Sequence, residues 1–299
     1  IAVTAPLDMA AVVGNKPVFS TRRVIRNGQF DVIPGPAWTD TTATSTGTYS
    51  VAAPTVLTGV VNAASVPVGA LVTGAGVGRE VYVTAVDVPG RIVTLSAPLY
   101  DAVGTQAYTF RRFKYVLDFS GFQQLDKMML DGLDIECAGA ASGIMLPPAG
   151  RAFSFADSFI NQPKNRGMTS IGLGCQGLLI NRCQFLSNEL SLRAQDRQTI
   201  GLNVNANDVK IRDCRVVRFR HFAVLNGGNH LILGNHIFSD DAELPGVRLP
   251  GIVLAQTNVG TTITGNHIDN CSIEWTNEFE ADPNFGSKFE FGGLTVTGN

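Results

Sequence analysis

Cysteine is scarce in this sequence and follows no regular spacing. The five cysteines are an odd number at irregular intervals, and no two of them form a CxxC pair; they are Cys137, Cys175, Cys183, Cys214 and Cys271. A disulfide framework normally uses an even number of cysteines, and a structural zinc site normally uses closely paired ones. We therefore expect free, buried thiols in a chain that folds in a reducing cytoplasm.

Long apolar runs, excess charge and helical periodicity are also missing. No run approaches the roughly 20 apolar residues of a membrane-spanning helix, so membrane insertion is not expected. The net charge of -2 gives no basic footprint, so nucleic acid is not an expected partner either. What the 299 residues do contain is 44% hydrophobic residues, enough to bury a large core.

A short pattern recurs along the second half of the chain. An apolar residue is followed three places on by a residue here called X, which is small or polar in most repeats, and two places later by another apolar residue. TTITGNHI (261–268) and HLILGNHI (230–237) show it plainly. The X residues lie 21 to 33 residues apart, a spacing typical of solenoids, and are Leu133, Ser158, Cys183, Cys214, Asn235, Asn266 and Asn299.

The residues around X predict short β-strands. Segments such as VKIRDCRV (209–216) are rich in Val and Ile and end at Gly or Asn turns. Like residues that recur once per coil are typical of a parallel β-helix, in which equivalent strands pair about 4.8 Å apart. We expect the X side chains to stack inside, with Asn amides hydrogen-bonded along the column. Segments such as IGLNV (200–204) and GIVLA (251–255) indicate a second stacked column.

Three parts can be distinguished along the chain. Residues 1–57 are expected to form an N-terminal cap or attachment region with a first coil. Residues 58–111 alternate in a strand-like way and are broken by Gly and Pro-Gly, which predicts a small inserted β-module. Residues 112–299 are expected to form the parallel β-helix. The chain ends on an X residue, so we expect its last coil to be continued or covered by another chain.

The stretch VLDFSGFQQLDKMMLDGLDIEC (116–137), followed by coils of the GNHI and IRDC kind, resembles the pectate-lyase-like right-handed β-helix superfamily. Within it, the chain is similar to tail spikes and receptor-binding spikes of phages and phage-derived gene-transfer particles. The VTGAGV, VTAVD and VTLSAP segments resemble small modules of phage fibre chains. The expected fold is all-β, a right-handed parallel β-helix solenoid with a small inserted β-module near the N-terminus. Such a resemblance concerns shape and leaves the chemistry open.

The resemblance implies a setting as well as a fold. It implies a homo-oligomer, a trimer, that attaches to other virion proteins through its N-terminal part. It places the protein on the surface of a phage-like particle after folding in the bacterial cytoplasm. It also implies that the protein binds or cleaves a bacterial surface polysaccharide of the capsular or lipopolysaccharide type. A secreted adhesin of the same fold is less favoured, because nothing here resembles a secretion signal.

Three long segments flank the short coil between Cys214 and Asn235: 187–198, 239–250 and 274–287. We expect all three on one side of the coils, around a notch at the short coil. Sugars need aromatic faces for their C–H surfaces and charged groups for their hydroxyls. The predicted glycan-binding residues are Trp275, Phe279, Arg218, Arg220 and His221.

Recognition and cleavage of the polysaccharide both remain open. Glycoside hydrolysis needs two carboxylates, about 5–5.5 Å apart for retention or about 6.5–9.5 Å for inversion. The candidates are Asp240, Asp241 and Glu243, with Asp196 as a partner. Surface loops are ordinarily acidic for solubility, the interpretation that we favour. The NTD, Gly-His-Gly and Arg-Ile-Lys motifs of polygalacturonases are absent.

No metal site or cofactor is predicted. A lyase would need Ca²⁺ and a basic residue, for which Arg218 or Arg220 could serve, but exposed arginine pairs are usually solvated. EADPN (280–284) is rich in oxygen and keeps Ca²⁺ as an alternative, although it lacks EF-hand spacing. His236 and His267 follow ladder asparagines on consecutive coils; two ligands are too few for a metal, so we interpret them as lining a turn.

Overall fold

The computed structural model describes residues 1–13, 22–100, 104–172, 175–187, 199–239, 249–276 and 292–299. Their contacts define two compact units. Unit 1 contains Ile1–Trp38, Lys114–Thr276 and the C-terminal residues to Asn299, and unit 2 contains Thr39–Phe113. Helical structure in these residues is limited to α1 (Met9–Val13) and two 3₁₀ turns, η1 (Pro36–Trp38) and η2 (Ala63–Ser65). No helix in the described ranges is long and apolar enough to cross a membrane.

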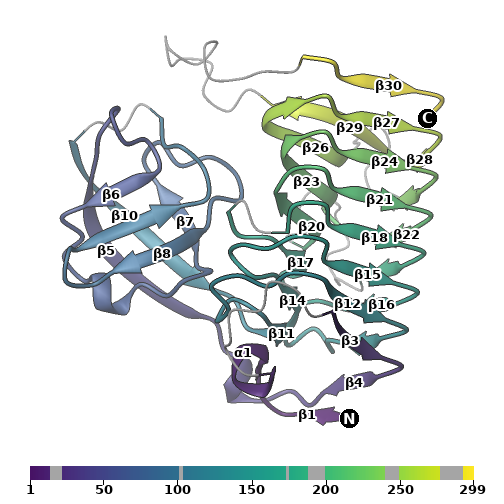
Figure 1. Ribbon diagram of the computed structural model, residues 1–299, viewed down its shortest axis with the longest axis horizontal. Helices are drawn as coiled ribbons and strands as arrows, with labels where there is room; N and C mark the ends of the chain where they lie inside the picture. Colours follow the sequence, from purple (N-terminus) through teal and green to yellow (C-terminus); the bar gives the residue numbers. More distant parts are fainter. Residues whose placement is uncertain (14–21, 101–103, 173–174, 188–198, 240–248, 277–291) are drawn as a thin grey trace. The chain divides into compact units, whose positions relative to one another are not determined.

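Unit 1 is built from three eight-stranded parallel sheets (Figure 1). Sheet 1 consists of β1 (Ala2–Val3), β4 (Gln29–Val32), β13 (Asp134–Glu136), β16 (Phe159–Asn161), β19 (Gln184–Leu186), β22 (Arg215–Val217), β25 (His236–Phe238) and β28 (His267–Asp269). Sheet 2 consists of β2 (Leu7–Asp8), β11 (Tyr115–Asp118), β14 (Ser142–Met145), β17 (Arg166–Thr169), β20 (Ile200–Asn205), β23 (His221–Gly228), β26 (Leu249–Val259) and β29 (Cys271–Thr276). Sheet 3 consists of β3 (Arg23–Arg26), β12 (Met128–Asp131), β15 (Ser154–Ala156), β18 (Leu179–Asn181), β21 (Lys210–Arg212), β24 (Leu231–Leu233), β27 (Thr262–Thr264) and β30 (Thr295–Thr297).

Successive coils of the chain contribute one strand to each sheet in turn. The consecutive strands β12, β13 and β14 belong to sheets 3, 1 and 2. They pair in parallel with β15, β16 and β17 of the next coil, strand by strand. The all-β class is confirmed, and long parallel sheets assembled in this way are consistent with a β-helix solenoid.

The X residues stack as the sequence predicted. The Cys214 backbone N–H donates to Asn235 Oδ1 at 3.0 Å, and Asn235 Nδ2 donates to Asn266 Oδ1 at 2.9 Å. Asn266 Nδ2 in turn donates to Asn299 Oδ1 at 2.8 Å. Each amide also satisfies backbone groups of its neighbours, so this buried polar column is paired. All five cysteines are free and buried, as expected.

A sharp turn before each X residue joins sheet 3 to sheet 1. The residue at this turn adopts a positive φ between 49° and 67° in every coil, at Asn27, Gly132, Asp157, Arg182, Asp213, Gly234, Gly265 and Gly298. This left-handed conformation redirects the chain within two residues. Because the turn is so short, sheet 1 strands begin directly after X, at the same place in each coil.

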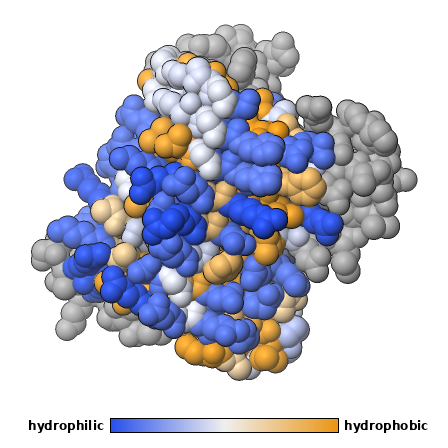
Figure 2. Space-filling view, turned by 90° about the vertical axis from the view of Figure 1, so that its right-hand side faces the viewer, coloured by the Kyte–Doolittle hydropathy of each residue, from blue (hydrophilic) through white to orange (hydrophobic). Residues whose placement is uncertain are grey.

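From β13 to β28, the strands of sheet 1 are three residues long and have one buried face. Their middle residues point into the core and pair with one another; they are Ile135, Ile160, Phe185, Val216 and Ile237. The flanking residues point outward, as strand alternation requires. Figure 2 shows the side of the molecule that lies on the right in Figure 1, where hydrophilic residues predominate and hydrophobic ones form small patches.

Unit 2 is a six-stranded antiparallel sheet with its own hydrophobic core. Its strands, in sheet order, are β7 (Leu71–Gly74), β10 (Gly104–Arg112), β5 (Thr41–Tyr49), β6 (Val56–Thr58), β9 (Ile92–Leu95) and β8 (Val83–Asp87). Residues 58–111 supply most of it, and β5 belongs to it as well. The threonines of β5 are good strand formers, and they pair with β10 along nine residues.

Candidate functional site

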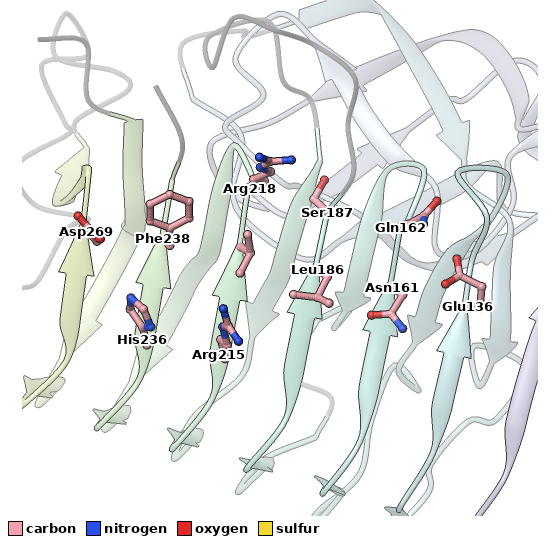
Figure 3. A pocket seen from close by; sticks show the side chains of 11 residues that line it. Glu136, Asn161, Gln162, Leu186, Ser187, Arg215, Arg218, His236, Phe238 and Asp269 are labelled. Atoms are coloured by element: carbon pink, nitrogen blue, oxygen red, sulfur yellow. The ribbon is translucent and has the colours of Figure 1, made fainter. Parts of the chain in front are cut away.

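A groove runs along the outer face of sheet 1 (Figure 3). It has a volume of about 690 Å³ and crosses successive strands of the sheet. Its lining residues come from β13, β16, β19, β22, β25 and β28 and the turns that follow them; they are Glu136, Asn161, Gln162, Leu186, Ser187, Arg215, Val217, Arg218, His236, Phe238 and Asp269.

The third residue of each of these sheet 1 strands points outward, and together these residues form the floor of the groove. In coil order this row reads Glu136, Asn161, Leu186, Val217, Phe238 and Asp269, each half-buried and in register with the next. The three central residues are apolar and the outer ones are polar. The floor is therefore an apolar stripe between polar ends, crossed by one side chain about every 4.8 Å.

The turns after the strands form one rim. Gln162 and Arg218 both have positive φ, 49° and 63°. Backbone hydrogen bonds to the next coil fix these turns, from Gln162 N to Leu186 O at 2.7 Å and from Arg218 N to Phe238 O at 3.0 Å. The strained backbone of Arg218 is thus held in place by its neighbours, and its side chain is exposed at the rim of the groove.

Two polar atoms in the groove lack partners. Asn161 Oδ1 and His236 Nε2 are buried and make no hydrogen bond within the described parts of the chain. Buried polar atoms are normally paired, and leaving one unpaired costs about 1–3 kcal/mol. Both atoms belong to groove-lining residues, so a ligand with hydroxyl groups could satisfy them.

A carboxylate cluster lies at one end of the groove. Glu136 is in register with Asp31 on β4, and Asp134 shares its face of β13. Burial raises the pKa of Glu136, and the charges of Asp134 and Asp31 raise it further, while the Ala138 N–H that donates to its Oε1 at 2.9 Å lowers it. Glu136 is therefore the carboxyl in the described groove that is biased toward its protonated form.

A histidine pair lies toward the other end. His236 and His267 are in register on β25 and β28, and their rings stack with centroids 4.6 Å apart and planes 15° from parallel. Asp269 lies two residues beyond His267 on the same face. The sequence interpretation placed these histidines at a turn, but both lie within strands.

Of the predicted glycan-binding residues, the structure brings Arg218 to the groove. Arg220 does not line it; its backbone N–H donates to Thr199 O at 3.0 Å. His221 begins β23 in sheet 2 and is only 6% exposed, so it cannot form an open cationic floor with the arginines. Trp275 lies in β29 in register with Leu254, and its side chain is outside the described part. Phe279 is outside it altogether.

The predicted catalytic carboxylates cannot be placed. Asp196, Asp240, Asp241 and Glu243 all lie outside the described residues. Along the chain, segments 188–198 and 240–248 each follow a strand of sheet 1, as expected.

The third predicted loop belongs to a different part of the coil. β29 already spans Cys271–Thr276, directly after a turn at Asn270 with φ 55°, so the residues after it follow sheet 2. Segments 188–198 and 240–248 therefore both come after sheet 1 strands along the chain, whereas the third predicted loop comes after a sheet 2 strand.

The groove residues that sequence reasoning missed occupy a fixed place in the repeat. They stand one, three and four positions after X, as His236 and Phe238 do after Asn235 and Ser187 does after Cys183. When the coils are aligned on X, these positions line up as rows of outward-facing residues on sheet 1. The signal was therefore present, but it appears only when equivalent positions are compared across coils.

No known protein family and no curated protein matches the sequence. Among solved structures, the chain is similar to DFA-IIIase from Arthrobacter chlorophenolicus A6 in complex with GF2, with 13% identity and a TM-score of 0.30 over 61% of this chain and 52% of that one. This chain thus spans about half the length of that protein. It is also similar to the Gp54 tailspike of Acinetobacter baumannii bacteriophage AP22 in complex with a capsular saccharide, with 10% identity and a TM-score of 0.24 over 99% of this chain and 67% of that one. TM-scores this low carry no information on function, so the evidence for a function comes from the groove.

Proposed function

We propose that the groove on sheet 1 binds a polysaccharide. The observation that carries the proposal is a continuous groove across several coils that contains two buried, unpartnered polar atoms, Asn161 Oδ1 and His236 Nε2. An extended polymer matches a groove that repeats one strand at a time. Its hydroxyl groups can both donate and accept hydrogen bonds, which is what an amide oxygen and an imidazole nitrogen require.

The remaining lining supplies the other contacts that a sugar chain needs. Phe238 and the apolar stripe beside it offer surfaces for C–H faces. Arg215 and Arg218 stand near the middle of the groove and can form paired hydrogen bonds to carboxylate groups. The best-matched ligand is therefore a polysaccharide that carries acidic sugars.

The proposal extends to the setting in which the groove works. Unit 1 is proposed to be a parallel β-helix, right-handed as parallel crossovers normally are. The chain is proposed to be a spike of a phage-like particle, assembled as a trimer with other virion proteins and displayed on the particle surface. Its ligand would be a bacterial capsular or lipopolysaccharide-type polymer that serves as the host receptor. The repeated coils and the groove chemistry support this setting.

Retention and reducing-end release, measured together on a panel of purified bacterial surface polysaccharides, test this function. We expect the protein to retain at least one acidic polymer, and Arg218→Ala to retain less of it. Lys210→Ala, which removes an exposed cation from sheet 3, is the matched control. Retention of no polymer, or equal retention by both variants, would overturn the proposal.

Cleavage is the second candidate function, and Glu136 favours it. Glu136 and Asp31 are in register on neighbouring strands, so two carboxyl groups share one face of sheet 1, and glycoside hydrolysis needs such a pair. A raised pKa suits Glu136 to donate a proton to a leaving oxygen. Asp240, Asp241, Glu243 and Asp196 stay as predicted alternatives.

The release arm of the same assay distinguishes these carboxylates. Fragments that disappear in Glu136→Gln and persist in Asp240→Asn/Asp241→Asn would assign the general acid to the described groove. The reverse pattern would assign it to the predicted loop. Retention without fragments in the native protein would leave recognition as the function.

A further inference from the structure

Three side chains that can bind a metal lie close together at one end of the groove. His236, His267 and Asp269 each offer one ligand atom, and these atoms all lie within 4.8 Å of one another. His236 and His267 face each other across two neighbouring strands, with ring centroids 4.6 Å apart. Asp269 joins them because residues two apart on a strand share a face. The fold brings the three groups together from two coils.

This donor set has the chemistry of a transition-metal site. Two imidazoles and one carboxylate are a ligand set that binds Zn²⁺ and related divalent ions, with bonds of about 2.0–2.2 Å. Donor atoms around a tetrahedral ion then lie roughly 3.4 Å apart. His267 is exposed and Asp269 half-exposed, so small rotations of these side chains can bring their atoms to that separation.

The unpartnered nitrogen of His236 is an independent sign of a ligand here. Its Nε2 is buried and makes no hydrogen bond in the described part of the chain. A neutral imidazole nitrogen without a hydrogen-bond partner is able to bind a metal ion through its lone pair. A stacked histidine pair that served only packing would not explain why this nitrogen is left unsatisfied.

We propose that His236, His267 and Asp269 bind a divalent first-row transition metal, with Zn²⁺ as the reference ion. Three protein ligands leave a fourth position open to water or another oxygen ligand. His236 and Asp269 both line the groove, so the open position lies at its edge. His236 Nε2 can serve either the metal or a sugar hydroxyl, so a bound metal would replace the hydroxyl at that atom. Metal titration without polysaccharide and polysaccharide retention without metal therefore test the two proposals separately.

One neighbouring charge limits the affinity of this site. Arg215 is in register with His236 on the side away from His267. Its side chain lies on the same face of the neighbouring strand, so its positive charge repels a cation bound there. Removing that charge should therefore strengthen metal binding, whereas removing a ligand side chain should weaken it.

Calorimetric titration of the full chain with Zn²⁺, after chelator treatment, tests the site. We expect one ion to bind per chain, His267→Gln and Asp269→Asn each to weaken binding by at least about tenfold, and Arg215→Gln to strengthen it. Asp134→Asn, on the same face of sheet 1, is the control and should leave affinity unchanged. Co²⁺ in place of Zn²⁺ should give the visible absorption of a tetrahedral site, lost in His267→Gln.

Several results would overturn the proposal. One is the absence of saturable Zn²⁺ binding, and another is binding that His267→Gln and Asp269→Asn leave unchanged. Both variants alter side chains at the surface, so loss of folding should not obscure the result; an unchanged thermal midpoint without metal checks this. Equal weakening by Asp134→Asn would point to diffuse attraction by surface carboxylates instead of this site.

Discussion

At the scale of single residues, the asparagine ladder shows how one side chain joins three coils. Asn235 accepts from the Cys214 N–H, donates to Ile211 O at 3.1 Å and donates to Asn266 Oδ1 at 2.9 Å. All of these groups are buried. Loss of the amide would therefore remove the side-chain partner of two backbone groups in the preceding coil and one hydrogen bond to Asn266 in the next.

Asn235→Ala should lower the free energy of unfolding by about 3 kcal/mol, because several buried groups lose their partners at about 1–3 kcal/mol each. Asn235→Ser is the matched variant, since Ser158 fills an equivalent position and accepts the Leu133 N–H at 2.9 Å. We expect Ser to cost less than Ala in urea denaturation. Equal costs would show that the side-chain hydrogen bonds contribute little.

His230 predicts how stability depends on pH. Its ring is 1% exposed, and burial lowers its pKa to about 4, an effect only partly offset by the Asn226 backbone and the charge of Asp208. Between pH 6.5 and about 4 the unfolded chain binds a proton that the folded chain excludes. Stability should therefore fall as the pH falls through this window, by up to about 3 kcal/mol.

The pH dependence can be assigned to His230 by substitution. His230→Leu removes the titrating group while filling a similar volume, so the unfolding free energy should change less between pH 6.5 and 4. His267→Gln, which removes an exposed histidine, should keep the native slope. A His230→Leu protein with the same slope as the native protein would contradict this assignment.

The candidate site could be predicted only in part at this scale. Arg218 was identified because cationic residues cluster in the sequence around the short coil. Asn161, Phe238 and Asp269 carry no local signal, because each is an ordinary strand residue. They become a site only when the strands of different coils lie side by side, and no single segment contains that information.

At the scale of the elements, the turn between sheets 3 and 1 determines where each coil bends. Gly265 has φ 63°, and a Cβ there would meet only Leu233 Cδ1 at 3.8 Å. There is room for a methyl group, so the cost of a side chain comes from the backbone conformation.

Gly265→Ala should therefore destabilise the protein by about 1 kcal/mol, the cost of a left-handed conformation for an L-residue. Gly292→Ala is the control, because Gly292 has no positive φ and nothing lies near its would-be Cβ. Thermal denaturation of the two variants checks the difference. Equal midpoints would show that the turn relaxes without strain.

Strand patterns in the sequence predicted most elements but not all their bounds. Short strands after each X residue were recognisable because tight turns with Gly or Asp precede them. The Thr/Ser-rich segment 39–50 was predicted to belong to the N-terminal region 1–57, yet β5 lies within it and pairs in the sheet of unit 2. Threonine favours strands, but the local sequence does not reveal which strand it pairs with. β29 was missed because the one-residue turn at Asn270 joins it directly to β28.

At the scale of the whole molecule, the repeat predicted the parallel sheets and the ladder, because equivalent residues of successive coils pair strand by strand. Each coil contacts mainly its neighbours, so equivalent residues reveal which strands pair. A groove across several coils follows from the same stacking. The proposed trimer and the proposed place on a phage-like particle would depend on surfaces between chains, which a periodic pattern within one chain does not specify.

The most direct test of the central claim is the affinity of the native protein and of Phe238→Ala for the polysaccharide that it retains. Calorimetry should show that Phe238→Ala weakens binding by about 1–3 kcal/mol, because an aromatic face at the middle of the groove is lost. Phe159→Ala, an exposed aromatic of sheet 1 outside the groove lining, should bind as the native protein does. Unchanged affinity in Phe238→Ala, or an equal loss in Phe159→Ala, would contradict the proposal that this groove binds polysaccharide.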